Sequence, residues 1–239
     1  MTDAPWEGNA CHYRTVFRDG DIVRMYYQCG HYALPDDPES VKPVTPKNLF
    51  CYAESLDGIS FIRPALGLYE LHGSKKNNIL LDGDIFKAQG ISIAEAGISV
   101  FKDANPACEP DARYKAVAIA RRPGERKNAG LVMLKSADGL RWSLMTEKPA
   151  ITEGRFDSQN LAFFDAARNE YRAYHRDAHR GVRGIKTETS HDFLRWSRPQ
   201  DLDYGSTKPQ ALYTNQILPY PRAPHVLVGF PLRYIDRGW

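Results

Sequence analysis

A short motif recurs three times in this chain and constrains its fold more than any other feature. It reads Ser-x-Asp, then Gly or Phe, then an aromatic residue a few positions on, and it occurs in "YAESLDGISF" (52–61), "LKSADGLRWS" (134–143) and "TETSHDFLRWS" (187–197). Asp-Gly pairs favour the positive φ angles of tight hairpins, and Ser and Asp side chains can bond turn N–H groups. Each copy therefore predicts a hairpin turn, with a different turn at the third copy because Phe193 replaces Gly.

Short runs of alternating apolar and polar residues surround these turns, whereas helical periodicity is scarce. The runs group in fours, and the motif falls between the third and fourth run of each complete group. The second run of each group recurs at a similar spacing, since Tyr114 and Tyr171 lie 57 residues apart and Tyr171 and His225 lie 54 residues apart. Four-stranded units repeated at about 40–55 residues are typical of a β-propeller. The predicted runs are "CHYRTVF", "DIVRMYYQ", "LFCYAES" and "ISFIRP"; "ISVFKD", "RYKAVAIA", "GLVMLKS" and "LRWSLM"; "NLAFFD", "EYRAYHR", "GIKTETS" and "LRWSRP"; and "LYTNQILPY" with "HVLVGFPLRY".

The sequence thus predicts an all-β chain with one propeller domain over residues 1–239. Residues 65–90 lengthen the first unit and are expected to form an inserted loop or small hairpin over one face. The chain contains about three and a half units. Their repeat spacing suits a five-bladed ring, which would need roughly 275 residues. We therefore expect a fragment that lacks its C-terminal part, and a missing N-terminal piece stays an open alternative.

Composition excludes several classes of protein. The formal net charge is +3 without a dominant Lys/Arg block, which argues against a nucleic-acid partner. No apolar run approaches a membrane span, and "MTDAPWEGNA" lacks the basic and apolar regions of a signal peptide. The four cysteines are widely spaced, which favours free thiols over a zinc site, with one disulfide left open for an exported protein. The compartment stays undecided, because an N-terminal segment can be missing.

Acidic residues near the first run of successive units are the candidate catalytic groups. First strands line the channel of a propeller, so carboxylates there should converge at one mouth of the channel. The candidates are Glu7, Asp103 and Asp157, with Glu153 as a rival to Asp157. Cleavage of a glycosidic bond needs one acid to protonate the leaving oxygen and a second carboxylate to attack carbon or activate water. We expect the three side chains in one basin, at separations of about 5–9.5 Å.

The stretch "FKDANP" resembles the Phe-Arg-Asp-Pro motif of glycoside hydrolase family 32, and the layout resembles the five-bladed propellers of families 32 and 43. "DAPWEGN" and "FDSQN" occupy the places of that family's other two acidic motifs, although this chain has Glu7 where the families use Asp and Asp157 where they use Glu. The resemblance implies that Glu7 is the nucleophile or base, Asp103 the transition-state stabiliser and Asp157 the general acid. The Ser-x-Asp turns resemble the Asp-boxes of sialidases, which are structural.

The resemblance also implies a carbohydrate substrate and requires neither a cofactor nor a metal. Side chains suited to stacking on sugars or bonding hydroxyls are the expected substrate-binding residues, namely Trp6, Asn9, Asn160, Arg176, Asn215 and Gln216. Two alternatives to a glycosidase stay open. One is a propeller that only binds sugar or another partner, and the other is a glycoside phosphorylase, which would show Arg176 or Arg222 beside the basin.

Overall fold

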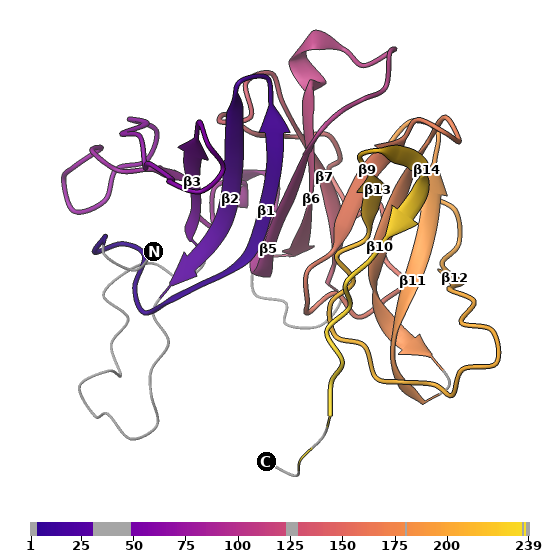
Figure 1. Ribbon diagram of the computed structural model, residues 1–239. Helices are drawn as coiled ribbons and strands as arrows, with labels where there is room; N and C mark the ends of the chain where they lie inside the picture. The colour runs from indigo at the N-terminus through magenta and orange to yellow at the C-terminus, as the bar shows by residue number, and fades with distance from the viewer. Residues whose placement is uncertain (1–3, 31–48, 123–128, 180, 236, 238–239) are drawn as a thin grey trace.

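A computed structural model describes residues 4–30, 49–122, 129–179, 181–235 and 237. The described residues form three four-stranded antiparallel sheets and a two-stranded hairpin, with two short 3-10 helices. The sheets follow one another side by side in chain order (Figure 1). Among these residues, no helix is long and apolar enough to cross a membrane. The predicted all-β propeller architecture is confirmed.

The first sheet contains β1 (Ala10–Asp19), β2 (Ile22–Gly30), β3 (Leu49–Ser55) and β4 (Ile79–Leu81) in that order. Its outer strand differs from the prediction. The stretch "ISFIRP" contributes only an isolated bridge between Glu54 and Ile62, and β4 comes instead from residues 65–90, which also hold the 3-10 helix η2 (Lys87–Gln89). The supposed insertion therefore completes the first blade, because Ile79 and Leu81 are apolar and fully buried against β3.

The second and third sheets match the predicted grouping more closely. The second contains β5 (Ser92–Lys102), β6 (Tyr114–Arg121), β7 (Gly130–Ser136) and β8 (Ser143–Leu144), with the 3-10 helix η3 (Pro110–Ala112) before β6. The third contains β9 (Leu161–Asp165), β10 (Glu170–His179), β11 (Val182–Ser190) and β12 (Gln200–Asp201), the last beginning just after the predicted run. The hairpin of β13 (Leu218–Tyr220) and β14 (Ala223–Val228) starts the fourth unit.

Apolar side chains pack face to face between neighbouring sheets, as they must when strands are apolar on both faces. One cluster joins the first two sheets around Tyr52 and Val132, and another joins the second and third around Phe101 and Tyr171. A third cluster covers the face of the first sheet that points away from the second, and it includes Cys29 and Cys51. The cysteines at positions 11, 29, 51 and 108 are all free thiols.

The Ser-x-Asp motif forms the same turn in all three copies. In each, the Ser hydroxyl accepts the N–H of the residue three positions after the Ser, at 2.8–2.9 Å. One Asp oxygen accepts the N–H groups of the second and third residues after the Asp, at 2.7–2.8 Å. The turn at residues 137–142, which joins β7 to β8, is longer than the tight hairpin turn we predicted. The predicted difference at the third copy is also wrong, because Phe193 adopts φ of 65°, close to the 78° of Gly58 and Gly139. Full burial among Phe101, Tyr171 and Trp196 holds Phe193 in that conformation.

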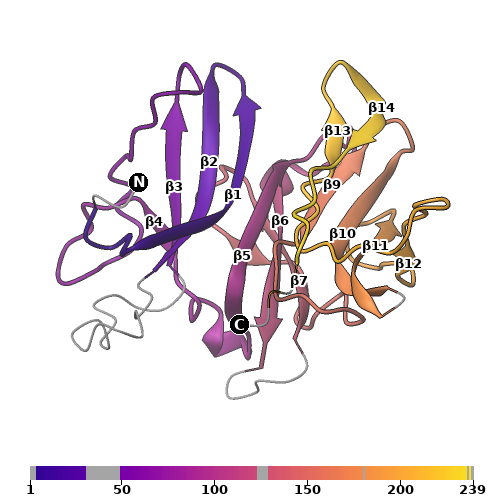
Figure 2. The ribbon, with the colours of Figure 1, turned by 60° about the horizontal axis from the view of Figure 1, so that its bottom comes forward.

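The innermost strands β1, β5 and β9 run in the same direction. At their C-terminal ends, Lys102 of β5 binds Asp19 of β1 at 2.5 Å. In the first half of β1, the Gln159 amide donates to the Arg14 carbonyl at 3.1 Å, which brings the segment that leads into β9 against β1. The propeller therefore has two faces, which we call the start face, where β1, β5 and β9 begin, and the end face, where they finish (Figure 2).

Candidate active site

Asp103 follows β5 and therefore lies at the end face. Its side chain is fully buried and forms an ion pair with Lys115 of β6, whose side chain is 5% exposed. The Tyr171 hydroxyl donates to the same carboxylate at 2.7 Å, and the Asn105 N–H donates to its other oxygen at 2.9 Å. Burial and the hydrogen bond to Asp103 raise the pKa of Tyr171 to about 12. The residue thus joins the second blade to the third.

Glu7 lies just before β1 and is also fully buried. The Tyr27 hydroxyl donates to one carboxylate oxygen at 2.5 Å, and Arg63 donates to the other at 2.6 Å. Asn78 extends the network by donating to the Tyr27 oxygen at 2.7 Å, and Trp6 donates to Asn78 at 2.7 Å. This network sits on the face of the first sheet that points away from the second, where it fastens the start of β1.

Asp157 differs from both, because its side chain is 64% exposed. It lies before β9 at the start face, and its carboxylate pairs with Arg176 of β10. The Tyr213 hydroxyl donates to its backbone carbonyl at 3.4 Å. Glu153 is exposed and lies outside the residues that line the cavity at Asp157.

These positions do not form the single basin of three carboxylates that we predicted. On β10, Tyr171 contacts Asp103 and Arg176 contacts Asp157, and five residues of a strand span about 16 Å. Asp103 and Asp157 are therefore at opposite faces of the propeller, while Glu7 is enclosed within the first blade. The motif resemblance misplaced Asp103 because "FKDANP" follows an innermost strand here, so its acid falls at the end face.

The predicted substrate-binding residues also separate. Asn160 and Asn215 are buried and bond backbone groups, with Asn160 donating to the Phe156 and Ser158 carbonyls and Asn215 to that of Tyr174. Both side-chain amides thereby hold backbone segments in place at the start face, and both residues have little contact with solvent. The remaining four occupy different places: Trp6 is held in the first blade, Asn9 is exposed beside it, and Arg176 and Gln216 line cavities at the start face.

A hub cavity of about 490 Å³ opens between the first blade and the start of the fourth. It is lined by His12, Tyr13 and Arg14 of β1 together with Gln159, Thr214 and Gln216. Gln216 donates to the Gln159 side chain across it. Tyr13 and Gln216 both have φ of 50°, and non-glycine residues in this region concentrate at functional sites. Sequence reasoning missed Tyr13, since its conformation arises from a bulge in β1 that no turn residue marks.

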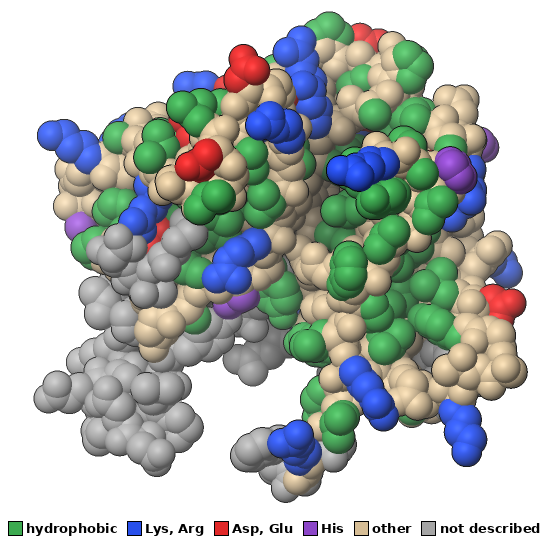
Figure 3. All heavy atoms as spheres, in the orientation of Figure 1, with side chains coloured by type: hydrophobic (Ala, Val, Ile, Leu, Met, Phe, Trp, Pro, Cys, Tyr) green, Lys and Arg blue, Asp and Glu red, His purple; other side chains and the backbone are tan. Residues whose placement is uncertain are grey.

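A second cavity, of about 620 Å³, begins at Asp157 and is strongly basic. Its polar lining comprises Asp157, Tyr213 and Tyr234 with four arginines, at positions 176, 183, 233 and 237. In Figure 3, a few separate Lys and Arg side chains lie along the lower edge of the molecule, near the C-terminal segment. We call this the arginine cavity. Sequence reasoning found Arg176 but not the other three, because the four arginines come from three separate segments of the chain.

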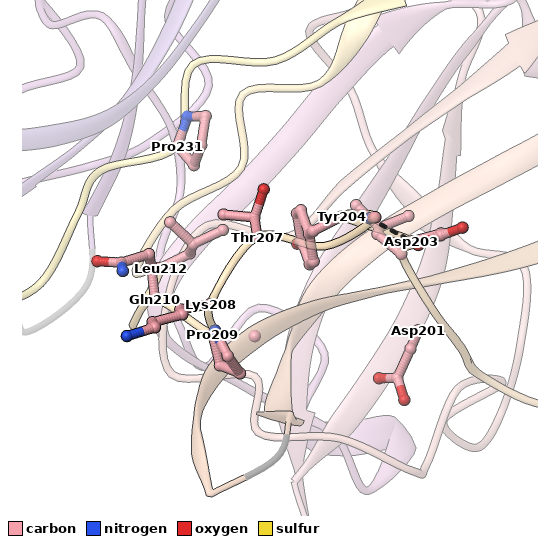
Figure 4. A pocket seen from close by; sticks show the side chains of 12 residues that line it. Asp201, Asp203, Tyr204, Thr207, Lys208, Pro209, Gln210, Leu212 and Pro231 are labelled. Carbon is pink, nitrogen blue, oxygen red and sulfur yellow. Dashed lines mark hydrogen bonds between the residues drawn. The ribbon is translucent and has the colours of Figure 1, made fainter.

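A third cavity, of about 480 Å³, lies along residues 201–212 beside β12 (Figure 4). Its two carboxylates already serve the fold: Asp201 pairs with Lys186 at 3.2 Å, and Asp203 accepts the Gly205 N–H at 2.8 Å. Within the described residues, no group of three His, Cys, Asp or Glu side chains could hold a metal ion. The hub and arginine cavities are therefore the candidate active site.

No protein-family model matches the sequence, and no curated protein matches it. Solved structures do resemble the chain. A glycosyl hydrolase from Bacteroides ovatus matches 98% of this chain and 63% of its own, at 15% identity and a TM-score of 0.54. A fructofuranosidase from Schwanniomyces occidentalis, complexed with fructosylnystose, matches 92% of this chain and 39% of its own, at 14% identity and a TM-score of 0.54. A family 117 glycoside hydrolase of Zobellia galactanivorans matches 90% and 62%, at 11% identity and a TM-score of 0.54.

At these identities the likeness establishes the fold, which is that of the propellers found in glycoside hydrolases. The chain spans less than two thirds of the length of each of these three structures.

Proposed function

We propose that this chain is the propeller of a carbohydrate-active enzyme that breaks a glycosidic bond at the start face. The observation that carries the proposal is the state of Asp157, which is exposed at a cavity beside the hub and held by Arg176. Glu7 and Asp103, in contrast, have every carboxylate oxygen occupied within the fold. The three structures of similar fold, which their descriptions call glycoside hydrolases or a fructofuranosidase, support the same class of chemistry.

In this proposal Asp157 gives its proton to the leaving glycosidic oxygen, a step that general acids accelerate by about 10²–10⁴-fold. The protonated form of Asp157 is the donor, and the ion pair with Arg176 stabilises the carboxylate that is left after the proton has gone. His12, Gln159 and Gln216 in the adjoining hub cavity offer donors and acceptors to sugar hydroxyls. Tyr213 and Tyr234 supply aromatic faces at the other side.

The group that attacks the anomeric carbon is either water or phosphate. Hydrolysis ordinarily uses a second carboxylate about 5–9.5 Å from the acid, and neither Glu7 nor Asp103 lies free beside Asp157. Phosphorolysis needs no second carboxylate, because phosphate is itself the nucleophile. The arginines around Asp157 therefore favour a glycoside phosphorylase as the second candidate function.

A panel of aryl glycosides and fructans, offered with and without phosphate, tests the proposal. The Asp157→Asn variant should lose about 10²–10⁴-fold in kcat/KM on any substrate that is turned over. Asp111→Asn is the matched control, because Asp111 is also 64% exposed and also forms an ion pair, with Lys135. The control should stay near the wild-type rate. Sugar binding without turnover would instead indicate a binding propeller, and equal rates for wild type and Asp157→Asn would refute the role of Asp157.

A further inference from the structure

Among its described lining residues, the arginine cavity holds more positive than negative charge. Four arginines line it and Asp157 is the single carboxylate in its described lining. One of them, Arg176, is used by Asp157, so among the described lining residues three positive charges face the cavity without a carboxylate to balance them. Like charges gathered in one concavity repel one another, and an anion bound between them removes that cost.

Arg176 supplies a second, independent observation. The residue is only 7% exposed, and its buried Nε has no hydrogen-bond partner among the described residues. A buried guanidinium N–H without a partner costs free energy, so such groups normally meet an acceptor. Arg176 lines the cavity, but its Nε has almost no exposed surface, so a ligand oxygen in the cavity can become that acceptor only after the Arg176 side chain shifts toward it.

Aromatic rings hold two of the arginines in place. The Arg183 guanidinium lies 3.8 Å from the centre of the Tyr234 ring, and that of Arg176 lies 5.5 Å from the centre of the Tyr213 ring. Stacking uses the face of a guanidinium and leaves its N–H edge available. Planar forks fixed in this way suit the two or more oxygens of a phosphate or sulfate group, whereas a neutral hydroxyl uses only one donor at a time.

We propose that the arginine cavity is a subsite for a tetrahedral oxyanion, either inorganic phosphate or a sulfate or phosphate ester on the sugar. This goes beyond the proposed function, because the subsite binds its anion whether or not a bond is broken. With inorganic phosphate, a phosphate oxygen forms a bond to the anomeric carbon as the glycosidic C–O bond breaks. Asp157 then protonates the leaving oxygen and regains a proton from the phosphate, giving a sugar phosphate and an alcohol.

Calorimetric titration of the whole chain at constant ionic strength tests the subsite without any turnover. The probes are inorganic phosphate, galactose 6-sulfate and unsubstituted galactose, with chloride as the background anion. Phosphate or the sulfated sugar should bind the wild type, and Arg233→Gln and Arg237→Gln should each weaken binding by roughly tenfold or more. Arg195→Gln is the matched control, since Arg195 is 93% exposed on a turn and lies outside the cavity. It should change binding less than twofold.

The two sources give different results. Binding of phosphate, with phosphate-dependent release of a sugar phosphate, assigns the subsite to inorganic phosphate. Binding of galactose 6-sulfate but of neither phosphate nor galactose assigns it to an ester on the sugar. The proposal is overturned if no probe anion binds more tightly than chloride, or if Arg195→Gln weakens binding as much as Arg233→Gln. Because Asp157→Asn should still bind the anion, loss of turnover in that variant leaves the subsite testable on its own.

Discussion

Replacement of Asp103 by Asn separates a structural role from a catalytic one. The substitution keeps the size of the side chain and one acceptor for Tyr171, but it removes the negative charge beside Lys115. Both partners are buried, with side-chain exposures of 0% and 5%. Removing one partner of a buried ion pair costs about 3–5 kcal/mol, because the other charge stays in the interior without compensation. We place Asp103→Asn near the lower end, at about 3 kcal/mol, because Lys115 keeps the Ala112 carbonyl as an acceptor.

The pH dependence of this loss follows from Lys115. Burial lowers the pKa of Lys115, but the bond to Asp103 and its charge outweigh burial and raise it. The wild type therefore gains stability from this lysine below the pKa of an unfolded lysine, about 10.4, and loses that gain at higher pH. In Asp103→Asn, burial is the main remaining influence on the pKa of Lys115 and lowers it, so the charged lysine destabilises the fold at neutral pH. The difference between the two proteins should thus shrink above about pH 10.

Urea unfolding followed by tryptophan fluorescence measures this difference from the midpoints at equal slope. The double variant Asp103→Asn/Lys115→Met should recover most of the loss, because no buried charge is left unpaired. A single variant that is as stable as the wild type but has no turnover would refute this reasoning. Asp103 would then act in catalysis, as the motif resemblance implies, and not between two blades.

Substitutions at three further positions test the turns and the hub. Phe193→Ala should cost about 3–5 kcal/mol in urea unfolding, and Phe193→Gly no more than that, since Gly tolerates φ of 65°; a much less stable Gly variant would contradict this. Partial burial raises the pKa of Asp138, but hydrogen bonds from the N–H groups of the following turn outweigh burial and lower it to about 2. Because the Asp138 side chain is 39% exposed, Asp138→Asn should reduce the free energy of unfolding at pH 7 by only about 1 kcal/mol. That difference should disappear as the pH falls from about 4 to about 2, and its persistence would refute the assignment. Gly97→Ala should destabilise the chain by about 1–3 kcal/mol in the same assay, because φ is 89° and the added Cβ would lie 3.1 Å from Tyr13; a neutral result would contradict it.

The strand pattern was predictable because it depends on local sequence. Alternating apolar residues and the Ser-x-Asp turns located the inner strands of each blade, and the sheets pair in the predicted order. The outer strand of the first blade was not predictable in this way. Residues 79–81 are preceded by a long segment rich in Gly, Asn and Lys, and they join β3 through burial of Ile79 and Leu81, which depends on the tertiary fold.

The third turn shows the same limit in a single residue. Turn chemistry indicated that Phe193 could not take the conformation of Gly, and for an isolated hairpin that reasoning holds. In the protein, contacts of Phe193 with rings from three different positions outweigh the local preference. The hydrogen-bond pattern set by Ser190 and Asp192 is therefore conserved among the three turns despite the substitution.

The carboxylates illustrate what sequence could not give about the site. Position along the chain placed each acid near the end of a strand but did not say at which face of the propeller the end lies. Asp103 follows its strand and Asp157 precedes one, which puts them at opposite faces. The arginine cavity could not be foreseen either, because its arginines come from β10, β11 and the C-terminal segment.

The dependence of rate on the leaving group tests the central claim, the acid role of Asp157, most directly. The measurement is kcat/KM of wild type and Asp157→Asn on two aryl glycosides of the same sugar, one with a phenol and one with a dinitrophenol as leaving group. If Asp157 protonates the leaving oxygen, the variant should lose about 10²–10⁴-fold on the phenyl glycoside and little on the dinitrophenyl glycoside, which leaves without a proton. Equal losses on both substrates, or no loss on either, would contradict the account.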